Sequence, residues 1–84
     1  MYGPLKMQLS GALTFANVPT VWDTFAADAV GKERVDVSAV TEVDSAGLAL
    51  ISALKRRAGA QCRVVGLTSK LATLASAYDV EALF

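Results

Sequence analysis

Segments with strand periodicity and segments with helix periodicity alternate along the chain, and this alternation is what most constrains the fold. Residues 7–14 and 34–40 alternate apolar and polar side chains, the pattern of a strand with one dry face. Residues 62–67 are predicted to form a third strand. Helical spacing predicts helices from Val18 to about residue 30 and from Ala46 to Ala58, and a third helix that Thr68 or Ser69 caps. The order favours parallel strands joined by right-handed crossovers.

The polar faces of the first two strands predict a sheet that is covered on one side only. The apolar face carries Met7, Leu9 and Leu13 in the first strand, and Val35, Val37 and Ala39 in the second. Arg34, Asp36 and Ser38 take the opposite face. Strands of doubly wound sheets are apolar on both faces, so this pattern departs from them. We predict a single α/β domain over residues 1–84, with a mixed sheet and helices packed on one face.

Residues typical of helix caps and helix ends mark the limits of the predicted helices. Asn17 is available to cap the first helix, and Gly31 is placed to end it. The second helix ends before Gly59, and its apolar stripe consists of Leu48, Ile51 and Leu54. The stripe of the third helix consists of Leu71, Leu74, Ala75 and Tyr78.

The composition argues against several classes of function. The 84 residues contain no histidine, which removes the commonest general base and the commonest zinc ligand, and we expect no metal or other cofactor. Eight basic residues balance eight acidic ones, so the chain lacks the positive charge that nucleic-acid binding requires. Cys62 is the single cysteine, which fits a reducing compartment. No signal peptide or membrane-spanning run is evident. These features predict a cytoplasmic, non-catalytic domain.

The strongest local signal is the segment Val43-Asp44-Ser45-Ala46-Gly47, at a strand-to-helix junction. A hydroxyl at the N-terminus of a helix faces free backbone N–H groups, which would stabilise a phosphate attached to Ser45. The neighbouring carboxylate of Asp44 would repel that phosphate. The alternative is structural, with Asp44 or Ser45 capping the helix and Gly47 permitting close packing.

Trp22 also has two interpretations. Val21, Phe25 and Ala29 already form a complete helical stripe, so Trp22 lies at the edge of that stripe, as a core residue or as a binding anchor. Cys62 is expected to be a buried strand residue rather than a nucleophile.

A small hydrolase or nucleotide-binding enzyme is the enzymatic alternative, and the sequence disfavours it. The G-x-S-x-G elbow and the Gly-rich phosphate loop are both absent. Lys55 lies ten residues beyond Ser45, which is roughly 15 Å along a helix and too far for a Ser–Lys pair.

Three segments resemble the STAS domain family of anti-anti-sigma factors and transporter-associated domains. They are Leu9-Ser10-Gly11-Ala12-Leu13, Val35-Asp36-Val37-Ser38 and Val43-Asp44-Ser45-Ala46-Gly47-Leu48-Ala49-Leu50, within a likeness from about Met7 to Phe84. The combination of Asp44-Ser45-Ala46-Gly47-Leu48 with a preceding strand that contains Asp36-Val37-Ser38 is fairly specific for this fold. The closer likeness is to the MlaB-type subunit of the Mla phospholipid ABC transporter, which has threonine in place of Ser45. Trp22 and the segment Thr73–Tyr78 match that type as well.

This resemblance implies a non-enzymatic cytoplasmic subunit that binds and regulates the transporter's ATPase, and so acts indirectly on its membrane permease. The transporter moves phospholipid and maintains outer-membrane lipid asymmetry. The family places partner contacts at Trp22, Asp44, Ser45 and Gly47. The alternative within the family is an anti-anti-sigma switch phosphorylated on Ser45. STAS domains usually begin with an extra strand, and only Met1–Lys6 precede the first strand here. A short or missing first strand would leave a sheet edge open to a second copy of the chain.

Overall fold

The computed structural model describes residues 5–78, and the order of its elements is the predicted one. The elements are β1 (Lys6–Leu13), α1 (Val18–Ala29), β2 (Arg34–Val43), α2 (Ser45–Ala58), β3 (Arg63–Val65) and α3 (Ser69–Ala77). The α/β class is therefore confirmed. No helix within residues 5–78 is long and apolar enough to cross a bilayer.

The three strands form one sheet in the order β1-β2-β3, and both pairings are parallel. The antiparallel strand that a mixed sheet requires is not present among residues 5–78. The extra first strand of STAS domains, which the sequence predicts to be short or missing here, would precede β1, and residues 1–4 lie outside the described residues. Within the described part, β1 and β3 are the two edges of the sheet.

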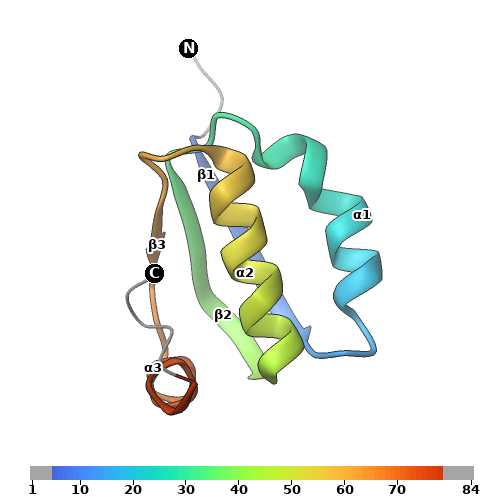
Figure 1. Cartoon of the computed structure of the whole chain (residues 1–84), viewed down its shortest axis with the longest axis vertical. Coiled ribbons are helices and arrows are strands. Elements are labelled where there is room, and N and C mark those ends of the chain that lie inside the picture. Colours follow the sequence, from blue (N-terminus) through green and yellow to red (C-terminus); the bar gives the residue numbers. More distant parts are fainter. Residues whose placement is uncertain (1–4, 79–84) are drawn as a thin grey trace.

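Two helices cover one face of the sheet, and the third lies at its end. α1 and α2 run side by side across that face, while α3 crosses the end at which the strands finish (Figure 1). The opposite face exposes Lys6, Gln8 and Ser10 of β1 together with Arg34 and Ser38 of β2. The wet face predicted from the alternating strands is confirmed.

The core lies between the sheet and the two long helices. Its largest fully buried side chains are Leu9, Leu13, Val35, Val37, Ile51, Leu54 and Leu71. The predicted stripe of α2 is buried in full, whereas α3 buries only Leu71 and Ala75. Tyr78, predicted to continue the α3 stripe, is 54% exposed. Because α3 crosses the end of the sheet, the face that it buries is short.

Strand β2 carries two bulges against β1, and these change which of its side chains face the core. The register runs from Gln8 opposite Asp36 to Ser10 opposite Ala39, so β2 has one extra residue in that interval. A second irregularity follows Gly11. The alternation shifts by one residue, which buries Val40 and leaves Ala39 half-buried. The prediction that Ala39 faces the core was wrong for this reason.

The ends of several elements also differ from the predictions. The Asn17 side chain does not cap α1, because its Oδ1 accepts a hydrogen bond from the Thr14 hydroxyl at 2.7 Å. The cap of α3, by contrast, is one of the two predicted residues, because the Thr68 hydroxyl oxygen accepts a hydrogen bond from the Leu71 amide at 3.2 Å. β3 is shorter than predicted and ends at Val65, since Gly66 has φ +76° and lies against Asp36 and Ser38 of β2.

Candidate functional site

Asp44 holds together the two loops at the end of the sheet where α1 and α2 begin. Its Oδ1 accepts a hydrogen bond from the Gly47 amide at 3.0 Å, which makes it the N-cap of α2. Its Oδ2 accepts from the Phe15 amide at 2.9 Å, in the loop that leads into α1. The bonds from Phe15 and Gly47 lower the pKa of the Asp44 carboxyl below its ordinary value. The side chain is therefore ionised at neutral pH and fixes one loop against the other.

Gly47 is buried at the point where α2 crosses the end of β1. A Cβ atom at this position would collide with the backbone carbonyl of Leu13 and would come within 2.8 Å of Val43 Cγ2. Glycine is therefore required for the helix to approach the strand. Since Gly47 is buried, it shapes the site from beneath and offers no surface of its own to a partner.

Ser45 is the first residue of α2, and its side chain is exposed to solvent. Its hydroxyl makes no hydrogen bond within residues 5–78, whereas the neighbouring Asp44 makes two. Of the two capping candidates, Asp44 is the cap. Ser45 is thus left at the surface, next to backbone N–H groups at the positive end of the helix dipole.

Trp22 lies on the face of α1 that is turned toward α2, and it is half-buried against the core. It lines an open apolar groove of about 350 Å³ between the two helices. The groove residues are Val18, Trp22, Ala46, Ala49, Leu50 and Ala53. On the α2 side three of the four lining residues are alanine, so short side chains form most of that wall.

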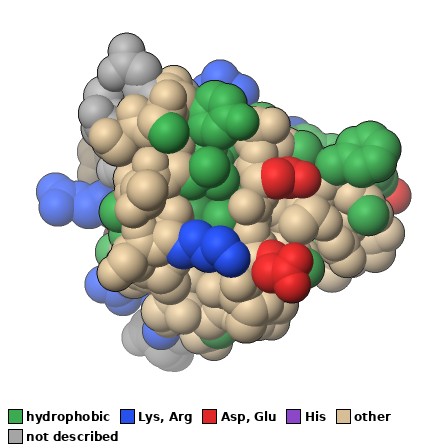
Figure 2. Space-filling model, turned by 90° about the horizontal axis from the view of Figure 1, so that it is seen from below, with side chains coloured by type: hydrophobic (Ala, Val, Ile, Leu, Met, Phe, Trp, Pro, Cys, Tyr) green, Lys and Arg blue, Asp and Glu red, His purple; other side chains and the backbone are tan. Residues whose placement is uncertain are grey.

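The groove and the start of α2 form one continuous surface, because Ala46 lines the groove and directly follows Ser45. We call this surface the α1–α2 site and define it by Trp22, Ser45 and the groove residues. The structure thus brings Trp22, Asp44, Ser45 and Gly47 to one region. Trp22 is half-buried at the groove, Ser45 is exposed, and Asp44 and Gly47 support them from beneath. The view from below shows hydrophobic, acidic and basic side chains mixed at the end where α2 begins (Figure 2).

Sequence reasoning missed the alanines of the groove. Ala46, Ala49 and Ala53 recur at helical spacing, beside the Leu48, Ile51 and Leu54 stripe. These alanines form a second stripe of small residues on α2. Alanine is common on exposed helix faces, so such a stripe does not by itself indicate a groove. Only the position of Trp22 opposite these alanines reveals the groove.

Two further kinds of reactive group matter among the described residues: side chains that could bind a metal ion, and the thiol of Cys62. No cluster of three or more His, Cys, Asp or Glu side chains occurs within residues 5–78. Cys62 is buried, as predicted, and burial raises the pKa of its thiol. A neutral, buried thiol is a poor nucleophile.

Comparison with known proteins identifies the family. The family model described as Mlab, STAS domain matches residues 3–84. The chain is an MlaB-type STAS domain. A search of curated proteins finds no match. The family supports a regulatory or protein-interaction role for this chain, and the exposed apolar groove is compatible with that role.

Proposed function

We propose that this STAS domain is a non-catalytic cytoplasmic subunit that binds and regulates the ATPase of an Mla-type phospholipid ABC transporter. The observation that carries the proposal is the α1–α2 site, where an apolar groove continues into the exposed Ser45 at the start of α2. The family match to the MlaB type supports the choice of an ABC-transporter ATPase as the proposed partner.

The groove has the form of a surface that receives a ridge from another protein. Trp22 supplies a large, rigid side chain at its edge, and aromatic anchors of this kind dominate the energetics of many interfaces. The alanine wall of α2 lets a partner helix or loop approach closely. Asp44 and Gly47 hold the α1 loop and the start of α2 in fixed positions, so little ordering is required on binding.

Regulation follows from selective binding to one state of the ATPase. A domain that binds one conformation more tightly than another shifts the population toward the bound form, without any chemistry of its own. In this proposal the domain lies at the cytoplasmic side of the inner membrane, held there through the ATPase and, indirectly, the permease. Its contribution is to the assembly and activity of a transporter that maintains outer-membrane lipid asymmetry.

Matched variants test the proposal. The tagged chain is purified from solubilised membranes of its native host, and the proteins that accompany it are identified. Ala49→Lys fills the groove with a charged side chain and should abolish recovery of the ATPase, whereas Ala72→Lys, at an exposed position of α3, should not. Ser45→Glu should disrupt binding to the ATPase. Ser69→Glu is its control, because it makes the same change at the start of α3, and it should leave that binding intact. Recovery of no ATPase with the unaltered chain contradicts the proposal.

A second candidate function is an anti-anti-sigma switch phosphorylated on Ser45. The exposed hydroxyl at the N-terminus of α2 favours it, because the helix dipole stabilises a phosphate there. The Asp44 carboxylate beside it opposes the same phosphate. Recovery of a kinase-like anti-sigma factor, together with a mass increase of one phosphate that is lost in Ser45→Ala, would replace the transporter assignment with this one.

Self-association through the edge of β1 remains a further prediction. β1 pairs only with β2 among the described residues, so its outer edge offers backbone groups to another strand. Analytical ultracentrifugation over a range of concentrations measures whether a second copy binds.

A further inference from the structure

The basic side chains of this domain gather at one end of the molecule. The three strands are parallel and all begin at the same end, where Lys6, Arg34 and Arg63 lie in one row across the sheet. Lys6 is opposite Arg34, and Arg34 is opposite Arg63. Residues that face each other in a sheet are close enough for like charges to repel, so the row is unfavourable for the isolated domain.

The last turn of α2 brings more positive charge to the same end. α2 runs back along the sheet, and its Ala58 carbonyl accepts a hydrogen bond from the Gly31 amide, just before β2 begins. Lys55, Arg56 and Arg57 occupy that turn. Seven of the eight Lys and Arg residues thus share one end, which we call the basic end. They are Lys6, Lys32, Arg34, Lys55, Arg56, Arg57 and Arg63.

Nearby acidic groups compensate only part of this charge. Lys6 pairs with Asp36 at 3.4 Å and Lys32 pairs with Asp28 at 3.7 Å. Arg34, Arg56 and Arg63 are exposed and form no ion pair within residues 5–78. Among residues 5–78, the carboxylates at this end are Asp28, Glu33 and Asp36, against seven cations. A chain of zero net charge is therefore strongly polarised, with Glu42 and Asp44 toward the other end.

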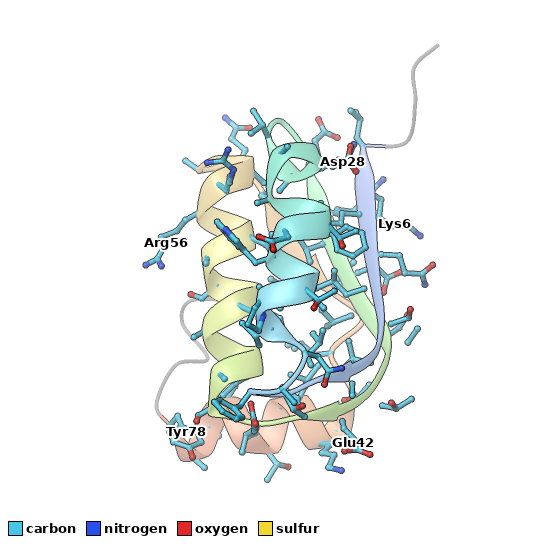
Figure 3. All side chains as sticks on the ribbon, turned by 90° about the vertical axis from the view of Figure 1, so that its right-hand side faces the viewer. Lys6, Asp28, Glu42, Arg56 and Tyr78 are labelled. Atoms are coloured by element: carbon cyan, nitrogen blue, oxygen red, sulfur yellow. The ribbon has the colours of Figure 1, made fainter. Side chains whose placement is uncertain are left out.

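The shape of the basic end favours an extended partner over a small anion. Lys6 and Arg56 point away from opposite sides of the molecule, so no single small ligand reaches both (Figure 3). Two large apolar side chains are exposed at the same end, Leu5 at 46% and Val30 at 61%. Leu5 directly precedes β1, and its carbonyl accepts hydrogen bonds from the Glu33 and Arg34 amides. Clustered cations beside exposed apolar side chains match the interface of a bilayer that contains anionic lipid.

We propose that the basic end adsorbs to the surface of a bilayer bearing anionic phospholipid headgroups. The cations contact headgroup phosphates, and Leu5 and Val30 reach the boundary between headgroups and acyl chains. No segment crosses the membrane in this arrangement. The α1–α2 site begins at the opposite end of β2, roughly 30 Å away at about 3.3 Å per residue. A protein can therefore contact the start of α2 while the basic end contacts a bilayer. The proposal stands independently of the proposed function.

Vesicle flotation with charge-reversed variants tests this inference. The full chain is floated with vesicles of equal parts phosphatidylcholine and phosphatidylglycerol, and with vesicles of phosphatidylcholine alone, at low and high salt. We expect binding only to the anionic vesicles, and loss of that binding at high salt because the charges are screened. Arg63→Glu should weaken binding roughly tenfold or more, and Arg56→Glu should do the same from the other side of the basic end.

Lys70→Glu is the matched control, because it changes the net charge equally but lies in α3 at the other end of the sheet. It should leave vesicle binding unchanged, and circular dichroism checks that all variants keep the fold. Absence of binding to anionic vesicles at low salt overturns the proposal. An equal loss of vesicle binding in Lys70→Glu and Arg63→Glu also overturns it. So does a result in which the domain binds a short DNA duplex or polyglutamate but not the anionic vesicles.

Discussion

The Asp44 carboxylate accepts a hydrogen bond from the Phe15 amide at 2.9 Å, across 29 residues of sequence. The same carboxylate caps α2 through the Gly47 amide, so one side chain fixes both the loop that enters α1 and the start of α2. These are the two elements that form the α1–α2 site. The junction interpreted from sequence as either a cap or a modification site is therefore at least a cap, and it orients the surface around Ser45.

Acid should weaken the stabilisation that the Asp44 carboxylate provides, over a pH range set by its pKa in the folded domain. The Asp44 pKa in the folded domain lies below its ordinary value of 3.8, because backbone amides of Phe15 and Gly47 donate to the carboxylate. The stabilisation is therefore complete above pH 3.8 and is lost as the pH falls through the lower folded value. The Asp36 pKa is lowered as well, chiefly by the Ser38 amide, and adds to the same trend.

Asp44→Ala isolates the contribution of this side chain. We expect a lower melting temperature than the unaltered domain at neutral pH, and a difference that shrinks as the pH falls below 3.8. Thermal unfolding followed by circular dichroism across this pH range measures both. Asp23→Ala, at an exposed carboxylate of α1, is the control and should leave the pH dependence of the melting temperature intact. A pH-independent difference for Asp44→Ala contradicts the ionic interpretation.

Gly47→Ala should destabilise the domain although it improves helix propensity. Replacing glycine by alanine inside a helix normally gains about 1 kcal/mol. Here the added Cβ collides with the Leu13 carbonyl, which belongs to the backbone and has no alternative rotamer. Overpacking of this kind costs about 1–3 kcal/mol, so the clash outweighs the propensity gain. Urea denaturation gives the free energy of unfolding, and an unchanged or increased value would show that α2 can shift away from β1.

The sequence predicted the order of the elements well because the first two strands and all three helices have strong periodicity. Met7, Leu9 and Leu13 face the core as predicted, and so do the Leu48, Ile51 and Leu54 side chains of α2. The family resemblance, carried by the segment Val43–Leu50, is confirmed by the match over residues 3–84. Local patterns of this kind depend on neighbouring residues in the chain.

The remaining features depend on contacts between distant segments. The bulges of β2 come from its register against β1, and nothing in the spacing of Val35, Val37 and Ala39 signals them. The groove at Trp22 exists only because α1 lies beside α2. The basic end is likewise invisible in a neutral composition, since its residues are scattered from Lys6 to Arg63 and meet through topology alone.

A pair of neighbouring substitutions tests the bulge. Val40 is 7% exposed and belongs to the core, while Ala39 is half-buried. Val40→Ser should therefore lower the free energy of unfolding by about 1.5–3 kcal/mol, the value of burying a valine side chain. Ala39→Ser should cost much less. Denaturant unfolding of the two variants decides the register, and the reverse order of effects would restore the uninterrupted alternation predicted from sequence.

Cys62 provides a probe of the packing beneath β3. Its side chain is 3% exposed, and burial raises the pKa of the thiol, so little thiolate exists at neutral pH. A thiol reagent such as iodoacetamide should label the folded domain at least tenfold more slowly than the unfolded chain, with the rate limited by local opening. Labelling followed by intact mass at increasing urea measures the rate as a function of stability. Labelling of the native domain as fast as that of the unfolded chain would place Cys62 at the surface and contradict the core packing.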